Sequence, residues 1–225
     1  MRLIYPLFVL IGWLFLSGCN NSTSTEDIEK FESAFGKANS TGLSILVQEF
    51  EKTLLQRHQT SFVSQAYQAH LESIQNLHIF EDWLGYQQRR DSFFVSVGKL
   101  DSDEFWFKPD TVELVNGHIV EKHYHTNPIT GELTRASRSE TLQIYQNSDS
   151  VMNLSRQLRT FNMIGRWMYG LTSIEHPTPF VKGYIDAKEA AGDISMSIMA
   201  NAFLHSKPNY NDYMVKRIIL VETYY

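Results

Sequence analysis

The sequence predicts an α+β fold, in which N-terminal helices pack with an antiparallel sheet and one mid-domain helix. Apolar residues follow helical spacing through residues 28–85. Residues 92–146 are rich in β-branched and aromatic residues in short runs separated by turn signals, and helical spacing returns over 150–170. An apolar content of 43% and an aromatic content of 13% are typical of a chain that buries a core.

The first predicted helix carries Ile28, Phe31 and Phe35 on one face, at positions i, i+3 and i+7. Thr23 and Glu26 lie three residues apart before this run, so they suit a capping box at its N-terminus. The short polar stretch that precedes the helix predicts a linker.

Two further helices are expected before residue 86. One has an apolar stripe over 43–54, with Ser40 or Thr41 as its N-cap. The other begins near Val63 and runs to about 84–85. The breaks between these helices are short, which predicts antiparallel neighbours.

A meander of strands is expected next, because β-branched and aromatic residues gather in short segments. Asn116-Gly117 is a strong hairpin signal, and residues 127–131 (NPITG) predict a second turn. The predicted strands are 92–100, 104–108, 111–115, 118–125, 132–137 and 140–146.

The last third of the chain is expected to form one helix over 150–170, closed by Gly170, and then three strands. The strands would be FVKGYID (180–186), DISMSIMANAFL (193–204) and YMVKRIILVETYY (213–225). The last two would pair as a hairpin across residues 205–212.

The N-terminus has the pattern of a secretory signal. A positive start at Arg2 precedes an uncharged apolar run over residues 3–16, and Ser17-Gly18 supplies a small-residue cleavage zone. The run is shorter than the roughly 20 residues of a spanning helix, so a permanent transmembrane segment is the weaker interpretation.

Leu16-Ser17-Gly18-Cys19 resembles the lipobox of bacterial lipoprotein precursors, and Cys19 is the single cysteine of the chain. The resemblance implies that the signal is cut before Cys19 and that this residue carries acyl chains. Asn20 in place of an aspartate implies the outer membrane, where the host has two membranes. The alternative is an ordinary cleaved secretory protein in which Cys19 is incidental.

These patterns divide the chain into a signal peptide (1–18), a lipidated tether (19–26) and a single globular domain (27–225). We expect the domain to have a helical part (27–86) and a sheet part (87–225). A net charge of −5 without a basic stripe argues against nucleic-acid partners, so contact with the membrane is expected through the anchor. No cofactor is expected.

Residues 90–200 also resemble a family of uncharacterised bacterial lipoproteins, on the segments VELVNGHIV, VMNLSRQL and YIDAKEAAGDISMSI. This resemblance implies a hairpin, a mid-domain helix, and an "ID" segment that leads to an acidic "D-x-I" strand. It implies no activity.

The best candidate for metal chemistry is Glu121, His123 and His125, which would share one face of a strand. Two imidazoles and a carboxylate are a known ligand set for divalent metals. The alternative is the solvated face of a half-exposed strand, with Val120 and Tyr124 directed inward.

A candidate binding surface is Phe105-Trp106-Phe107, because strand alternation would place Trp106 opposite its neighbours and leave one aromatic face exposed. The alternative is two buried rings and one ring at the rim. His70 is expected to be a hydrogen-bonded core histidine, and Arg89-Arg90 a solvated pair at a helix–strand junction.

The leading functional hypothesis is a non-enzymatic, membrane-anchored envelope lipoprotein that binds an envelope protein or a small envelope component through an aromatic surface or a sheet edge. One alternative is a membrane-tethered hydrolase, metal-dependent or serine-based, that acts on envelope material. The other is an immunity-type inhibitor of a toxin.

Overall fold

A computed structural model describes residues 22–75, 83–126, 130–141 and 147–224. In these residues nine α-helices, one short 3-10 helix and five strands follow one another along the chain. They are α2 (Thr25–Phe35), α3 (Lys37–Arg57), α4 (Val63–Gln75), α5 (Trp83–Ser96), η2 (Ser102–Glu104), β1 (Trp106–Phe107), β2 (Thr111–Val115), β3 (His118–Thr126), β4 (Leu133–Thr141), α6 (Ser148–Gln157), β5 (Thr160–Phe161), α7 (Arg166–Thr172), α8 (Pro179–Ala191), α9 (Met196–Ser206) and α10 (Tyr213–Thr223).

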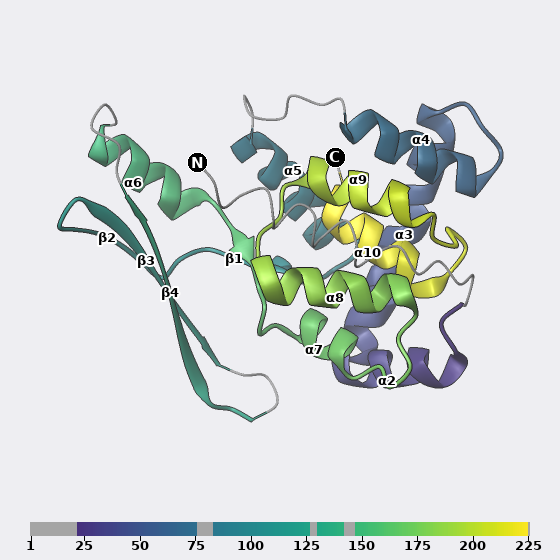
Figure 1. Ribbon diagram of the computed structural model, residues 1–225, viewed down its shortest axis with the longest axis horizontal. Coiled ribbons are helices and arrows are strands. Elements are labelled where there is room, and N and C mark those ends of the chain that lie inside the picture. The colour runs from purple at the N-terminus through teal and green to yellow at the C-terminus, as the bar shows by residue number, and fades with distance from the viewer. Residues whose placement is uncertain (1–21, 76–82, 127–129, 142–146, 225) are drawn as a thin grey trace.

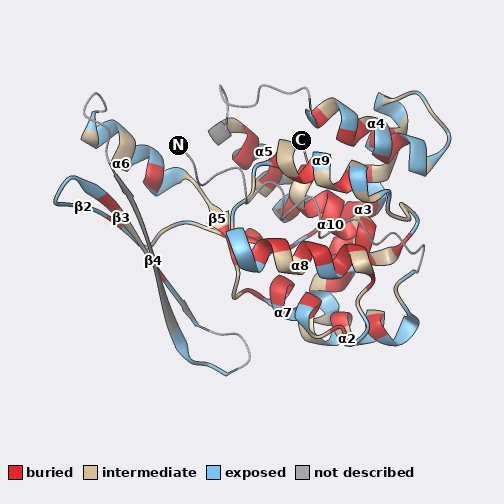
Figure 2. Cartoon of the chain, in the orientation of Figure 1, coloured by how far each residue is buried: buried red, intermediate tan, exposed pale blue. Residues whose placement is uncertain are grey.

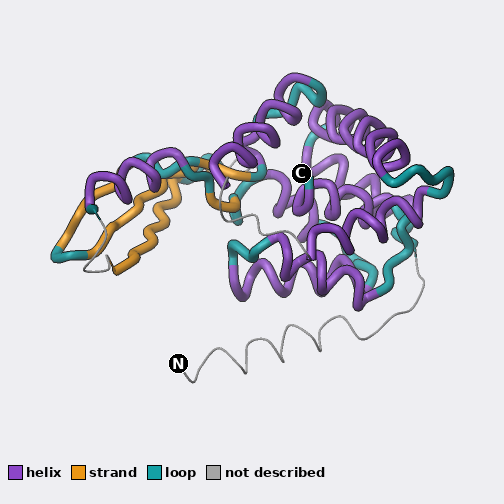
Figure 3. The backbone as a smooth tube through the Cα atoms, turned by 90° about the horizontal axis from the view of Figure 1, so that it is seen from above, coloured by secondary structure: helices purple, strands orange, loops and turns teal. Residues whose placement is uncertain are grey.

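The predicted α+β class is confirmed, although helices make up most of the fold. Figure 1 shows a body of helices from both ends of the chain, with a three-stranded sheet and α6 extending from one side of it. Seen from above in Figure 3, α6 lies along this sheet, and its residues contact β2. We call β2, β3, β4 and α6 the sheet lobe. A second, two-stranded sheet pairs β1 with β5 at the junction with the body.

The hydrophobic core lies in the helical body. One cluster of buried side chains runs from Phe31 on α2 to Val221 on α10, and Figure 2 shows buried residues concentrated in these helices. Aromatic rings interlock at its centre, where the Trp167 indole lies edge-on to Phe31 and Phe35. Burying such rings is the main favourable term in the folding of the body.

The first two helices form as predicted, but their caps differ. Ser24, not Thr23, caps α2, and its hydroxyl accepts from the backbone N–H of Asp27 at 3.1 Å. The expected capping of the next helix by Ser40 or Thr41 is wrong, because α3 already begins at Lys37. Gly36 joins the two helices with φ of +97°, a conformation that a side chain would strain.

The expected strand over 92–100 is wrong, since residues up to Ser96 continue α5. Tyr86, Arg90 and Phe94 follow one another at helical spacing, and all three are buried. Their shared face packs toward the body, so tertiary burial outweighs the β propensity of SFFVSV. The third predicted helix is shorter than expected, because α4 ends at Gln75, and residues 76–82 lie outside the described residues.

The predicted hairpin at Asn116-Gly117 is confirmed. Both residues have positive φ, +51° and +79°, as the tight turn between β2 and β3 requires. The three strands run antiparallel in the order β2-β3-β4, with Val112 opposite Glu121 and His123 opposite Ala136. The second predicted turn, over 127–131, falls between β3 and β4, but residues 127–129 lie outside the described residues.

The single helix expected over 150–170 is two helices, α6 and α7, separated by the short strand β5. Leu158 leaves helical geometry with ψ of 144°, and β5 then pairs with β1 through Trp106 and Phe161. The second helix continues past Gly170 to Thr172. The helix is interrupted here because the residues of β5 pair with β1 at the junction between the sheet lobe and the body.

The prediction of three C-terminal strands is wrong. The three segments form the helices α8, α9 and α10, and no hairpin spans 205–212. Each helix begins at a polar N-cap, namely Thr178, Ser195 and Asp212, whose side chain accepts from backbone N–H groups of the first turn. The end of the segment YIDAKEAAGDISMSI therefore enters helix α9 instead of the acidic strand that the family resemblance implies.

The expected division at residue 86 does not separate a helical part from a sheet part. Residues 87–225 contain α6 to α10 as well as the strands, and α2 packs on α7 while α4 packs on α9. The N-terminal and C-terminal helices therefore share the core.

The segment 19–26, predicted as a tether, is hydrogen-bonded to the helical body from Ser22 onward. The Thr23 backbone N–H donates to Asp212 Oδ2 at 2.6 Å, and the Asn209 amide donates to the Ser22 hydroxyl at 3.0 Å. The chain is therefore fixed to the connection between α9 and α10 three residues after Cys19. No helix in the described part of the chain has the length and apolar character needed to cross a membrane.

Candidate functional site

The structure places the proposed metal ligands on β3, and it shows which face of the sheet Glu121 and His123 occupy. His123 is buried and Tyr124 is exposed, so Glu121 and His123 lie on the inner face of the sheet, and the alternative with Val120 and Tyr124 inward is wrong. The His123 ring is 4.5 Å from the Phe107 ring and nearly perpendicular to it. Its Nδ1 atom is buried without a hydrogen-bond partner.

These residues do not gather into a metal site in the part of the structure that is described. Glu121 lies opposite Val112 on β2 and Arg138 on β4, and His123 lies opposite Ala136 on β4. Among the described side chains no group of three or more His, Cys, Asp or Glu residues is placed to hold a metal ion. His125 belongs to β3, and its side chain lies outside the described residues.

The aromatic segment does not form an exposed binding surface. Phe105 is fully buried and Trp106 is 5% exposed, while Phe107 is partly buried. Strand alternation does not apply to Phe105, because it follows η2 in helical geometry and β1 begins only at Trp106. Both rings therefore turn into the core, where they contact Phe94.

The expectation for His70 is confirmed. Its ring is fully buried, and its Nε2 atom lies 3.0 Å from the Thr223 carbonyl oxygen and 3.2 Å from the Thr223 hydroxyl. It is a structural link between α4 and the end of α10. Cys19, the expected lipidation site, lies outside the described residues.

A cleft lined by three arginines is the strongest candidate site that the structure reveals. It has a volume of about 410 Å³ and lies where the end of α3, the middle of α5 and the residue after α10 meet. We call it the arginine cleft, and its lining residues are Arg57, Tyr86, Arg89, Arg90 and Tyr224. Arg57 and Arg89 are exposed at its rim, whereas Tyr86 and Arg90 are buried.

Arg90 is held at the bottom of the arginine cleft by aromatic rings. Its guanidinium carbon lies 3.5 Å from the centroid of the Trp106 ring and 5.6 Å from that of Tyr86. The face of an aromatic ring attracts a cation, which offsets part of the cost of burying the charge. Burial also raises the pKa of Tyr86 to about 12, so this phenol is neutral at physiological pH.

Two histidines next to the arginine cleft are held neutral. The rings of His58 and His70 are 6.4 Å apart. Burial, together with the charge of Arg57, lowers the pKa of both, that of His70 to about 4. Near pH 7 the positive charge of this region is therefore supplied by guanidinium groups.

A buried ion pair joins α8 to α10 in the core. Lys188 Nζ lies 2.9 Å from Glu222 Oε2, with 2% and 6% of the two side chains exposed. The Tyr184 hydroxyl donates to Glu222 Oε1 at 2.6 Å, and burial raises the pKa of Tyr184 well above its ordinary value. Since Lys188 also lies over the Phe161 ring, the network is enclosed by protein and acts as a structural link.

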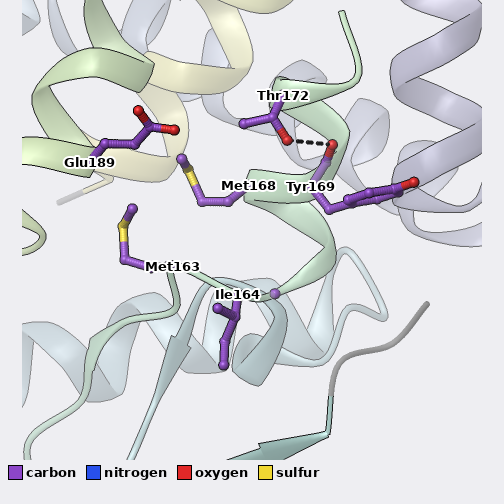
Figure 4. A pocket seen from close by; sticks show the side chains of 7 residues that line it. Met163, Ile164, Met168, Tyr169, Thr172 and Glu189 are labelled. Atoms are coloured by element: carbon purple, nitrogen blue, oxygen red, sulfur yellow. Dashed lines mark hydrogen bonds between the residues drawn. The ribbon is translucent and has the colours of Figure 1, made fainter. Parts of the chain in front are cut away.

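A smaller hollow of about 200 Å³ lies between α7 and α8 (Figure 4). Met163 and Met168 extend toward it, with Glu189 on α8 as its acidic residue. The Thr172 hydroxyl at its edge donates to the carbonyl of Tyr169 at 3.1 Å. Its volume is below the roughly 300 Å³ of typical ligand sites, which makes it the weaker candidate.

Sequence reasoning missed the arginine cleft. Arg89-Arg90 is not a solvated pair at a helix–strand junction: both residues lie within α5, and Arg90 is 4% exposed. The spacing of Tyr86, Arg90 and Phe94 was the available signal, because it places an arginine on the apolar stripe of a helix. Comparison with protein-family models, curated proteins and solved structures found no match to this chain.

Proposed function

We propose that this protein is a lipid-anchored lipoprotein of the bacterial cell envelope that binds a partner protein through the edge of its sheet lobe. The observation that carries the binding role is β4, a nine-residue strand at the edge of the order β2-β3-β4. The anchor rests on the lipobox that ends at Cys19.

The anchor and the docked segment together would hold the body close to a membrane. Two residues, Asn20 and Asn21, lie between Cys19 and Ser22, so the two Cα atoms are about 10 Å apart at most when the chain is extended. The connection between α9 and α10, to which Ser22 and Thr23 are hydrogen-bonded, would then face the lipid surface. Two or three acyl chains would make this attachment stable, whereas one chain alone binds only marginally.

The free edge of β4 suits a partner that adds an extended segment. One side of β4 pairs with β3 from Leu133 to Thr141, and no described strand pairs with its other side. An unpaired edge offers a row of backbone donors and acceptors, which peptides use when they extend a sheet. The segment LTRASRSET contains no proline that would interrupt this row.

The alternatives gain less support. A metal-dependent hydrolase would need Glu121, His123 and His125 to line a concave site, and neither the arginine cleft nor the hollow of Figure 4 contains them. An immunity-type inhibitor is one kind of binding protein, so the identity of the partner would distinguish it.

The anchor is tested by Cys19→Ala. Metabolic labelling with a palmitate analogue should mark the wild type and the control Asn21→Ala, but not Cys19→Ala, and intact mass should show the acyl chains. An unlabelled wild type would contradict the anchor while leaving the binding role open.

The binding role is tested by placing a photo-crosslinking amino acid in cells at Ala136 or Ser137 on β4, and at Lys182 on α8 as a control. Lys182 is exposed on the body, so it should give no specific adduct. We expect one defined protein adduct from at least one β4 position, identified by mass spectrometry. If β4 and Lys182 give the same adducts, or none, the sheet edge is not the binding surface.

A further inference from the structure

We propose that the arginine cleft binds a phosphate monoester, through the guanidinium groups of Arg57, Arg89 and Arg90. This inference rests on the helical body and is independent of the anchor and of the sheet edge. The lining of the cleft contains three cationic side chains and two phenol rings, and no carboxylate is among its described lining residues.

The number and kind of cations favour phosphate. A guanidinium group presents paired N–H donors that match two oxygens of a carboxylate or phosphate. A phosphate monoester has three peripheral oxygens and close to two negative charges near neutral pH. Three oxygens and two charges match three guanidinium groups better than a carboxylate does, since a carboxylate offers two oxygens and one charge.

Arg90 supplies independent evidence, because one of its donors is unused. The side chain is 4% exposed, and its Nε atom is buried without a hydrogen-bond partner. Its protein ion pair is weak: Nη2 lies 3.4 Å from Asp91 Oδ1, while the other oxygen of Asp91 lies 2.5 Å from Arg159 Nε. Buried donors in native proteins are usually satisfied, and an anion in the cleft would satisfy this one.

The walls and the size of the cleft suit the organic part of such an ester. The Tyr224 ring stacks on Phe93 at 4.1 Å, which fixes one aromatic wall, and Tyr86 supplies another. The volume of about 410 Å³ falls within the range of about 300–1,000 Å³ seen for small-molecule sites.

The test is a calorimetric titration of the full chain, in a neutral detergent, with phenyl phosphate. We expect saturable binding that weakens at least tenfold in Arg57→Gln and in Arg89→Gln. These rim residues are exposed, so their replacement should leave the fold intact, which circular dichroism will check. Arg156→Gln, on α6 and outside the cleft, is the matched control and should change the Kd by less than twofold.

Three results would overturn the proposal. They are the absence of saturable binding to the wild type, equal Kd values for the wild type and both rim variants, and binding of benzoate as tight as that of phenyl phosphate. The last result would assign the cleft to carboxylates.

Trp106 offers a second readout, because the Arg90 guanidinium lies over its ring. Phenyl phosphate should change the intrinsic fluorescence of the wild type, and Trp106→Phe should lose this change. Heat of binding without a change in Trp106 emission would place the ligand away from Arg90 and contradict the proposed site.

Short-chain lipids distinguish two sources of the phosphate. Dihexanoyl phosphatidic acid carries a phosphomonoester headgroup, and dihexanoyl phosphatidylcholine carries a diester. Displacement of phenyl phosphate by the first lipid alone supports a lipid headgroup as the ligand, and displacement by neither supports a soluble phosphate ester. Equal displacement by both lipids would contradict recognition of a monoester.

Discussion

His70 shows how one buried polar side chain couples stability to pH. Its ring is fully buried and bonded through Nε2 to Thr223, and burial lowers its pKa to about 4. In the unfolded chain the imidazole has its ordinary pKa of about 6.5. As the pH falls from about 6.5 to about 4, the unfolded chain gains a proton that the folded protein does not bind, so stability falls across this window.

We therefore predict that His70→Gln weakens the dependence of stability on pH. The difference between the pKa of His70 in the unfolded chain and in the folded protein corresponds to about 3 kcal/mol of unfolding free energy. Most of this is lost by pH 4.5. In urea unfolding, His70→Gln should be less stable than the wild type at pH 7, and this gap should narrow at pH 4.5. The control His205→Gln alters an exposed histidine and should follow the wild type. Parallel pH profiles for the wild type and His70→Gln would contradict the assignment.

At the scale of single residues, the sequence predicted the burial of His70 correctly and that of Arg90 wrongly. His70 lies on an apolar stripe, and the structure confirms it as a core histidine. Arg90 lies on a similar stripe, but the aromatic ring that holds it comes from Trp106, sixteen residues further along the chain. Local spacing carries no information about such a contact.

Among the elements, α3 and the turn after α5 meet at an unusually close contact. A Cβ atom built on Gly42 would lie 2.2 Å from the carbonyl oxygen of Gly98 and 3.0 Å from side-chain atoms of Leu100. The glycine lies inside α3, where alanine would ordinarily be favoured by about 1 kcal/mol. The clash is with backbone, so the two segments would have to separate.

We predict that Gly42→Ala destabilises the protein by about 1–3 kcal/mol, in spite of the higher helix propensity of alanine. Thermal and urea unfolding would measure this loss of stability. Thr41→Ala changes the neighbouring exposed residue and should stay within about 0.5 kcal/mol of the wild type. A Gly42→Ala variant as stable as the wild type would show that this contact is not close in solution.

Among the helices, α2 was predicted correctly and α10 wrongly, and the two differ in how one-sided their apolar pattern is. Helix α2 has a clear stripe and was predicted correctly. Helix α10 buries Ile218, Ile219, Leu220 and Val221 in succession, so its apolar residues do not form a one-sided stripe. A continuous apolar run is equally consistent with a buried strand and with a buried helix. The N-cap Asp212 was the available signal for a helix.

For the whole molecule, the helical body and the sheet lobe differ in how much apolar surface they bury. Val112 and Ile119 are the buried hydrophobic residues described on the three strands, and neither belongs to the main core cluster. Segments with few buried apolar contacts open more readily than a well-packed core.

We predict that amides of β2 and β3 exchange with solvent through a lower-energy opening than those of α3 and α10. Hydrogen exchange followed by mass spectrometry would measure both regions in one experiment. Val112→Ala should lower protection in β2 and β3 further and leave α10 unchanged. Equal protection of the two regions would show that the molecule opens as one cooperative unit.

By itself the sequence determined the α+β class, the first helices, the hairpin at Asn116-Gly117 and the expectation of an anchor at Cys19. These depend on local chemistry: one-sided apolar periodicity, the positive φ of a tight turn, and a short motif behind an apolar run. Only the tertiary structure decided that the C-terminal segments are helices, that the inner face of β3 carries His123, and that Arg57, Arg89 and Arg90 line one cleft. Those features depend on which surfaces become buried against each other, and segments far apart in the chain supply these surfaces.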